Sequence, residues 1–423
     1  MKILSKKINL WEALLISTAI ALSLVFLVTE NINYMFWAVF STAGAVLILA
    51  KFSVFSLATI ILTYITVPVY FQDNFGTSYG ILQAMDTPLY AKEIYSIIFF
   101  YLIVLYLFLK FSLLLNAEKK IYRSNFFIND TVLIFSCAAS IAFSLIAFPR
   151  VPGIYYEGAR FSALLPGNGW NHLALVFLIV ISCRYHNSWA ARLSGIFVVF
   201  WFLSHGERVD ILGYLVGMVL IYLNRHQLSK KRLILLFIFA IIIFLLMIAI
   251  GQIRTADMIT LSTLVREVLV QRTATDIAYV FNSSIHFAYH HELLHGVTYT
   301  SYLFELIPML PAPYLTQNIL QSLFATPGGE FYLSEALINF GIGGIYIVQI
   351  LELLVIILLL KSKSRYIVAA FCFTVCTQFR ILWYGRTYVE TAIVIYLPIL
   401  ILFINTLNRR KNSCIQQRRI GIC

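Results

Sequence analysis

Residues 233–252 read LILLFIFAIIIFLLMIAIGQ, and the first 18 of them are apolar without interruption. An α-helix rises about 1.5 Å per residue, so about 20 apolar residues cross the hydrocarbon core of a bilayer. A helix that is apolar on every side has no face to present to water. The stretch therefore predicts a membrane-spanning helix.

The same pattern recurs along the whole chain of 423 residues. Hydrophobic residues make up 61% of it and charged residues 12%, and the mean hydropathy is +0.86. Soluble domains are about 45–50% apolar and about 25% charged, so a soluble, disordered or disulfide-framework protein is excluded. We expect about 12 transmembrane helices, over residues 10–29, 34–50, 52–71, 94–115, 131–148, 169–183, 190–204, 209–223, 233–252, 331–360, 366–384 and 388–405.

The fold class that follows is an all-α polytopic integral membrane protein. No nucleotide-binding domain, low-complexity tract or internal repeat interrupts the apolar runs, so we expect a single membrane domain over residues 1–423. The N-terminal stretch has no small-residue cleavage site after its apolar part, which favours a retained first helix.

The basic residues predict the orientation. The chain carries 31 Lys and Arg against 19 Asp and Glu, a net charge of +12. Loops rich in Lys and Arg stay in the cytoplasm. With a cytoplasmic N-terminus, 22 of the 31 fall in alternate connections, which predicts an even number of spans and both termini in the cytoplasm. The positive charge is then a topology signal, and no nucleic-acid partner is expected.

Eight of the nine remaining basic residues are arginines, all expected on the outer face. A guanidinium fork binds phosphate oxygens two at a time, which lysine cannot do. This bias favours an anionic ligand; the alternative is ion pairing with outer acids such as Glu157 or Asp210. The eight are Arg150, Arg160, Arg208, Arg254, Arg266, Arg272, Arg380 and Arg386.

One long outer segment, residues 253–330, stands out among short connections. In its first part Leu261, Leu264, Val265, Val268 and Leu269 recur at helical spacing, which predicts an amphipathic helix at the membrane surface. Later, LIPMLPAPYL (306–315) has three prolines in six residues and cannot continue a helix. A periplasmic loop of this size is usually functional.

Metal motifs are scarce. His291-Glu292-Leu293-Leu294-His295 matches H-E-x-x-H, which binds zinc when both histidines share a helix face. We interpret the match as accidental, because Gly296 follows at once and no third ligand is evident. No two acids stand at i and i+2, so the Asp-x-Asp that holds a metal–nucleotide sugar is missing. We expect neither a metal nor another cofactor.

Two segments place charges of both signs at the outer ends of spans. Residues 148–170 bring Arg150, Glu157 and Arg160 together with tyrosines that include Tyr156, and residues 204–217 contain Glu207, Arg208 and Asp210. Charges near lipid tend to face a polar interior, so both segments are candidate functional sites. An aromatic belt at the membrane interface is the other explanation for the tyrosines.

The chain resembles the Wzy-type polymerases, which join the repeat units of bacterial O-antigen. Gly206-Glu207-Arg208 resembles the family's glycine–x–arginine at the outer end of a mid-chain span. The proline-rich stretch 306–315 resembles its counterpart in the long outer loop. GGEFYLSEALINFGIGGIYIV (328–348) resembles the acidic–aromatic run that leads into the next span. The resemblance covers about residues 145–390.

The resemblance implies a glycosyltransferase of the bacterial inner membrane with a periplasmic active face. It would move a glycan from undecaprenyl pyrophosphate onto another lipid-linked repeat unit, with membrane lipid and a chain-length regulator as partners. An acid would deprotonate the acceptor hydroxyl, and arginines with Tyr156 would hold the pyrophosphate and glycan. The candidate bases are Glu207 and Glu157, and the further candidates are Asp210, Glu330 and Glu390. The candidate binding residues are Arg150, Arg160, Arg208, Arg254, Arg272, Arg386 and Tyr156.

Two alternatives remain. An O-antigen ligase shares this topology, but its loop end carries a histidine–asparagine pair where this chain has Gly329 and Glu330. A flippase or transporter of lipid-linked glycans also has many spans. Transporters usually show repeated halves and broken helices, and neither is evident in this sequence.

Overall fold

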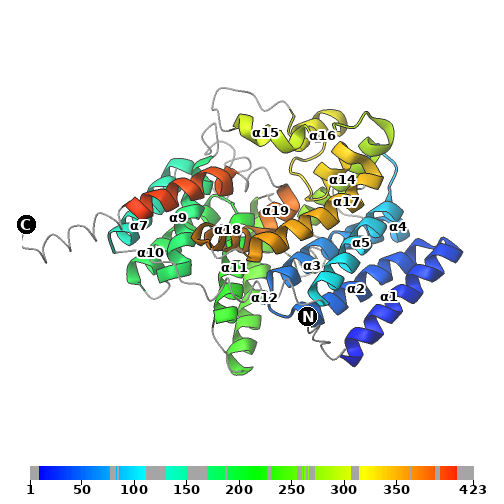
Figure 1. Cartoon of the computed structure of the whole chain (residues 1–423), viewed down its shortest axis with the longest axis horizontal. Helices are drawn as coiled ribbons and strands as arrows, with labels where there is room; N and C mark the ends of the chain where they lie inside the picture. Colours follow the sequence, from blue (N-terminus) through cyan, green and yellow to red (C-terminus); the bar gives the residue numbers. More distant parts are fainter. Residues whose placement is uncertain are drawn as a thin grey trace, which may run out of the picture. The chain divides into compact units, whose positions relative to one another are not determined.

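The computed structural model describes residues 9–76, 82, 85–110, 130–149, 169–185, 188–225, 230–254, 260, 262, 265, 272–305, 314–361, 364–385 and 391–406. Within these ranges the regular elements are helices, with no strand (Figure 1). They are α1 (Leu10–Thr29), α2 (Ile32–Ala50), α3 (Val54–Tyr64), α4 (Thr66–Phe75), α5 (Ala91–Lys110), α7 (Asp130–Ala147), α9 (Gly169–Tyr185), α10 (Trp189–Ser204), α11 (Val209–Arg225), α12 (Lys230–Arg254), α14 (Arg272–His290), α15 (Thr298–Glu305), α16 (Thr316–Phe324), α17 (Ser334–Lys361), α18 (Arg365–Cys376), α19 (Gln378–Tyr384) and the π-helical turn η2 (Ala392–Tyr396).

Six helices of the described residues are long and apolar enough to cross a membrane. They are Leu10–Thr29, Ile32–Ala50, Val54–Phe75, Ala91–Lys110, Asp130–Ala147 and Ser334–Lys361. Shorter apolar helices coincide with the other predicted runs, such as Trp189–Ser204 and Val209–Asn224. An all-helical protein with membrane-length apolar helices is therefore confirmed for this part of the chain. The count of twelve spans and the orientation stay predictions.

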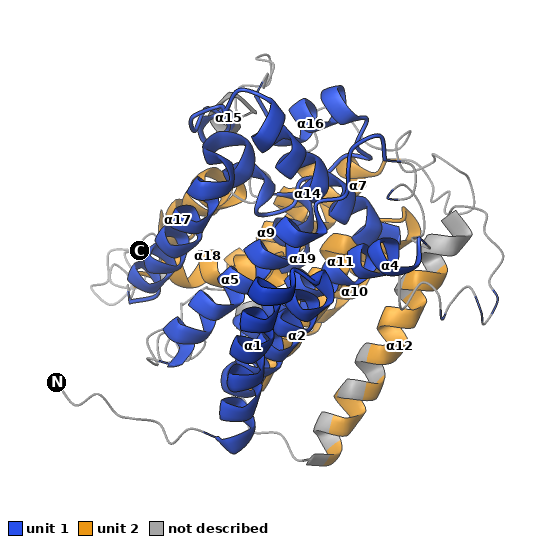
Figure 2. Cartoon of the chain, turned by 90° about the vertical axis from the view of Figure 1, so that its right-hand side faces the viewer, with its two compact units in different colours: residues 1–120, 260–362, 378–387 blue, residues 121–259, 363–377, 388–423 orange. Residues whose placement is uncertain are grey.

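The chain divides into two compact units, each assembled from separate stretches (Figure 2). Unit 1 contains residues 1–120, 260–362 and 378–387. Unit 2 contains residues 121–259, 363–377 and 388–423. The predicted run 366–384 accordingly forms two helices, because α18 ends at Cys376 and α19 begins at Gln378. The two helices belong to different units.

Unit 1 begins with a helical hairpin whose ends are capped. Asn9 accepts a hydrogen bond from the Trp11 amide at the start of α1, and Asn31 accepts one from the Asn33 amide at the start of α2. Glu30 adopts a left-handed conformation (φ 55°) that ends α1. Because these caps leave only Glu30 and Asn31 between the helices, α1 and α2 pack side by side in opposite directions.

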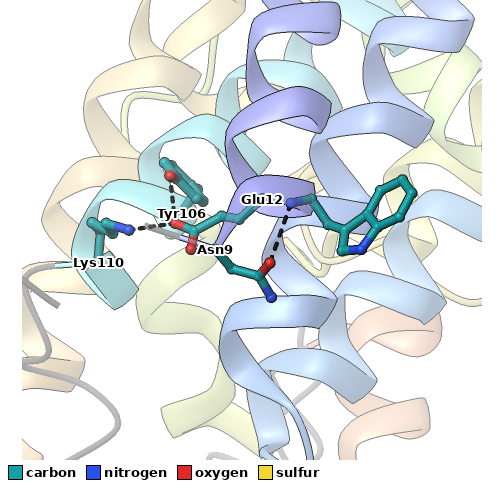
Figure 3. A network of polar contacts seen from close by, with 5 residues as sticks. Asn9, Glu12, Tyr106 and Lys110 are labelled. Atoms are coloured by element: carbon teal, nitrogen blue, oxygen red, sulfur yellow. Dashed lines mark hydrogen bonds and ion pairs between the residues drawn. The ribbon is translucent and has the colours of Figure 1, made fainter. Parts of the chain in front are cut away.

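A buried polar contact joins α1 to α5 (Figure 3). The Glu12 side chain is 3% exposed, and its Oε1 lies 2.6 Å from Lys110 Nζ and accepts a hydrogen bond of 2.7 Å from Tyr106. Removing one partner would leave a buried charge unpaired, which makes this contact a strong constraint. It places the start of α1 and the end of α5 at the same end of unit 1.

The long segment 253–330 contains a buried helix that the sequence did not predict. The expected surface helix falls almost entirely outside the described residues. Beyond it, α14 packs against α17, and Ala278, Val280 and Phe281 are each 0% exposed. Asn282 to Ser284 are also fully buried. These polar core residues break the hydrophobic pattern, which is why hydropathy assigned the segment to a loop.

The apolar run 331–360 does not form one straight helix. Inside α17 the backbone of Gly341 is non-helical (φ 70°, ψ −173°), and the Tyr332 hydroxyl donates a hydrogen bond to Glu352. A straight helix would separate residues 332 and 352 by about 30 Å. The chain therefore reverses at Gly341, and we call residues 326–340 the re-entrant segment.

Contacts with α5 fix the depth of this reversal. Gln349 Nε2 lies 3.5 Å from the Ile97 carbonyl, and the rings of Phe100 and Tyr346 are 4.7 Å apart, so the later part of α17 runs beside α5. The Tyr101 and Tyr332 rings are 6.5 Å apart. Tyr332, within the re-entrant segment, therefore lies beside the middle of α5.

Candidate functional site

The predicted site residues divide between the two units. Unit 2 holds Glu207, Arg208 and Asp210, and unit 1 holds Arg272 and Glu330. The structure describes only the backbone of Arg254, at the end of α12. The remaining predicted residues lie outside the described part of the chain: Arg150, Tyr156, Glu157, Arg160, Arg386 and Glu390.

In unit 2 a tight turn between α10 and α11 presents the predicted charged residues. The amides of His205 and Glu207 both donate to the Phe202 carbonyl, at 3.1 and 2.9 Å, which closes α10. Gly206 adopts φ 76°, a conformation that favours glycine. The Leu212 amide donates to the Arg208 carbonyl at 2.8 Å, so α11 begins directly after the charges.

The side chains of this turn combine two buried acids with an arginine. Glu207 is 2% exposed and Asp210 is 1% exposed, while Arg208 is partly exposed. Asp210 lies in the first turn of α11, where the helix dipole favours a negative charge. The His205 ring stacks on Phe148 with centroids 4.9 Å apart. The turn therefore offers carboxylates that can accept a proton and a guanidinium that can meet an anion.

In unit 1 the re-entrant segment presents Glu330, which is 4% exposed. Its neighbour is α19, since the Tyr332 amide donates to the Leu382 carbonyl at 3.0 Å. Gly385 (φ 88°) has no side chain, so its backbone can lie close to the Glu330 carboxylate. A Cβ at residue 385 would lie only 2.6 Å from Glu330 Oε2. Arg380 on α19 is 8% exposed and its guanidinium lies 5.1 Å from the centre of the Tyr384 ring. The structure thus places an acid and an arginine, which the sequence predicts on the outer face, on adjoining segments of one unit.

A buried network that the sequence did not predict holds the end of the re-entrant segment next to Gly341. Thr298 Oγ1 donates to Glu335 Oε1 at 2.9 Å and accepts from Asn339 Nδ2 at 2.6 Å. Asn339 Oδ1 accepts from the Gly296 amide at 2.8 Å. Glu335 is 3% exposed and Asn339 is 0% exposed. No local pattern connects residues about forty positions apart, so this network could not be read from sequence.

A second missed cluster joins α14 to the residue before α5. The Tyr90 hydroxyl lies 2.9 Å from His286 Nδ1 and 3.2 Å from His290 Nε2, and the two imidazole rings are 4.3 Å apart. Asn282 Oδ1 accepts a hydrogen bond of 2.8 Å from the Tyr90 amide. Burial, with a contribution from the neighbouring His290 and His291, lowers the pKa of His286.

This cluster predicts a loss of stability in mild acid. Because the pKa of His286 in the folded protein lies below its unfolded value of about 6.5, the neutral ring stabilises the fold above that pH, and the contribution is lost as pH falls through the folded pKa. The melting temperature of the purified protein in detergent should therefore drop as the pH falls below about 6.5. His286→Gln should flatten that drop; an equally steep drop in this variant would contradict the assignment.

The H-E-x-x-H match does not have the geometry that zinc proteases need. α14 ends at His290, so His291 and His295 do not lie one turn apart on a helix, and His295 has φ 48°. Among the described residues no group of three or more His, Cys, Asp or Glu side chains is placed to hold a metal ion.

Comparison with known proteins gives no match. No protein-family model, no curated protein and no solved structure matches the chain.

Proposed function

We propose that this protein is a polymerase that joins undecaprenyl-pyrophosphate-linked oligosaccharide repeat units into a bacterial surface polysaccharide such as O-antigen. It acts from the periplasmic face of the inner membrane. The observation that carries the proposal is the turn before α11, where buried Glu207 and Asp210 flank partly exposed Arg208 in an otherwise apolar helical chain. Charged groups kept among membrane helices mark a functional site by default.

The proposed reaction is a single displacement at a sugar carbon. The acceptor hydroxyl of one lipid-linked repeat unit forms a bond to the anomeric carbon of the donor glycan. The bond from that carbon to the pyrophosphate oxygen breaks, and undecaprenyl pyrophosphate leaves with both bonding electrons. Glu207 takes the hydroxyl proton as general base, and Glu330 is the second candidate. Arg208 stabilises the negative charge that develops on the leaving pyrophosphate.

An anion site made of arginine explains why no metal is required in this proposal. A bidentate guanidinium can neutralise a pyrophosphate as it leaves. The chain's outer arginines outnumber its outer lysines, and Arg208 and Arg272 are among those that the structure describes. A periplasmic ligase would use the same donor, so it remains the nearest alternative within this reaction class.

A transporter of lipid-linked glycans is the second candidate, and one observation favours it. Transporters bind substrate where membrane helices are broken near mid-depth. No such break is evident from the sequence, but the structure breaks the predicted run 331–360 at Gly341 and the run 366–384 after Cys376. A polymerase and a transporter differ in which lipid-linked product accumulates, so their deletion phenotypes separate them.

The experiment is deletion of the gene followed by complementation with Glu207→Gln, Glu330→Gln and wild type. For a polymerase, the deletion strain should display surface core capped with a single repeat unit, because transport and ligation still operate. At least one glutamine variant should give the same phenotype at normal protein level, since loss of a general base lowers a rate by about 10²- to 10⁴-fold. Bare core in the deletion strain would contradict polymerisation and indicate a ligase or transporter.

A further inference from the structure

A non-helical turn of the re-entrant segment lies deep in unit 1. Residues 328–333 carry no helix, yet Gly329, Glu330, Phe331 and Leu333 are buried and Tyr332 lies beside Tyr101 in the middle of α5. At membrane depth such backbone is tolerated where it is enclosed by protein or lines a polar site. We call residues 328–333 the inner turn.

Three buried polar atoms beside the inner turn have unused hydrogen-bonding capacity. They are Ser334 Oγ, Gln378 Oε1 and Trp383 Nε1, whose side chains belong to residues that are 0%, 8% and 6% exposed. Among the described residues, no side chain or backbone group hydrogen bonds any of the three. Burying a polar group in this way destabilises a fold, so each instance needs an explanation.

Backbone contacts bring the three residues to one region. Ser334 follows the inner turn directly, and its amide donates to the Phe331 carbonyl at 2.7 Å. Tyr332 is hydrogen bonded to Leu382, the residue before Trp383, and a Cβ on Gly329 would lie 3.0 Å from the Tyr384 ring. Gln378 begins the same short helix, α19. The three residues therefore belong to the segments that meet at this backbone contact, namely α19 and the inner turn with the residue after it.

The chemistry of these groups indicates which ligand they fit. The Trp383 indole N–H only donates, the amide oxygen of Gln378 only accepts, and the Ser334 hydroxyl does both. A phosphate needs donors alone and a metal cation needs acceptors alone. Sugar hydroxyls both donate and accept, so a sugar can satisfy all three kinds of group.

We propose that the inner turn and α19 form a subsite for one sugar ring of the glycan, a hexose or N-acetylhexosamine. The subsite rests on the proposed function for the identity of its ligand as a lipid-linked glycan. The buried Glu330 and Arg380 of the same two segments add charged partners at its edge. The subsite explains why the fold keeps polar groups without protein partners at this depth.

The test compares protein stability with sugar binding in three variants: Ser334→Ala, Gln378→Leu and Trp383→Phe. Because none of the three atoms has a hydrogen-bond partner among the described residues, each change removes an unpaired buried polar atom, although Trp383→Phe also removes ring volume from the core. The melting temperature of the Ser334→Ala protein in detergent should rise by about 2 °C. Its affinity for a sugar should fall at the same time, a combination that a purely structural group would not give.

Binding is measured with short-chain polyprenyl pyrophosphates that carry glucose, galactose, N-acetylglucosamine or no sugar. For wild type, at least one sugar should raise affinity about tenfold over the bare lipid. Each variant should reduce that tenfold increment by at least about 2-fold, the value of one weak hydrogen bond. Ser283→Ala on α14 is the matched control: Ser283 is 0% exposed and its Oγ has no hydrogen-bond partner in the described chain, so stability should rise with the sugar increment unchanged.

Two outcomes would overturn the subsite. One is a wild-type protein that binds every sugar-bearing probe no better than the bare lipid. The other is a sugar increment that survives all three substitutions, which would mean that the groups are hydrated and not ligand-binding. Both readouts measure binding without turnover. A strain phenotype of bare core would remove the polymerase proposal and leave the sugar subsite standing, so the two failures are distinguishable.

Discussion

Replacing Arg208 by lysine should reduce the length of the surface glycan to one repeat unit while the protein remains at its normal level. Lysine keeps the positive charge but cannot make two parallel hydrogen bonds to phosphate oxygens. Losing a charge-assisted contact that forms in the transition state costs about 2–4 kcal/mol, or about 30- to 1000-fold in rate. The measurement is the chain-length distribution of surface polysaccharide, with membrane protein level determined in parallel.

Arg192→Lys is the matched control within unit 2. Arg192 is exposed near the start of α10 and its guanidinium lies 5.7 Å from the Trp189 ring centre. It belongs to the basic residues that we predict on the cytoplasmic side, so long chains should persist in this variant. Normal long chains in Arg208→Lys as well would show that the charge of Arg208 alone matters, as in a structural ion pair.

Gly217→Ala should destabilise unit 2 more than any other single-methyl change there. Gly213 and Gly217 lie one turn apart on α11 and face α18. A Cβ on Gly217 would lie 2.5 Å from Cys376 Cα, and one on Gly213 would lie 2.6 Å from the Cys376 carbonyl oxygen. Backbone atoms cannot rotate away as a flexible side chain can, so the helices must separate. Overpacking of this kind costs about 1–3 kcal/mol or more.

Gly343→Ala provides the comparison, since a Cβ there meets nothing within 4 Å. Alanine is favoured over glycine in a helix by up to about 1 kcal/mol, so this variant should melt at or above the wild-type temperature. The melting temperature of the Gly217→Ala and Gly343→Ala proteins in detergent is measured by the loss of the monodisperse peak in gel filtration. If the Gly217→Ala protein had the same melting temperature as wild type, α11 and α18 would not pack at this distance.

Local sequence was enough to predict most of the helices. Each apolar run, from 10–29 to 388–405, coincides with helical residues in the described chain. The reason is local: a backbone surrounded by hydrocarbon must satisfy its own hydrogen bonds, and a helix does so within one segment. The turn at Gly206-Glu207-Arg208 was also found from sequence, because charges interrupting two apolar runs are conspicuous.

Only the tertiary structure decided the sites in unit 1. The run 331–360 is predominantly apolar, and its reversal at Gly341 depends on the Tyr332–Glu352 contact and on the amides of Leu294 and His295, which donate to the Ile338 and Asn339 carbonyls. Hydropathy averages over a window, so it registers neither a single glycine with positive φ nor partners far apart in sequence. Contacts between residues far apart in sequence also bury α14 and place Glu330 beside Gly385. Sequence determined which segments leave water, whereas long-range hydrogen bonds and close glycine contacts determined where their polar residues meet.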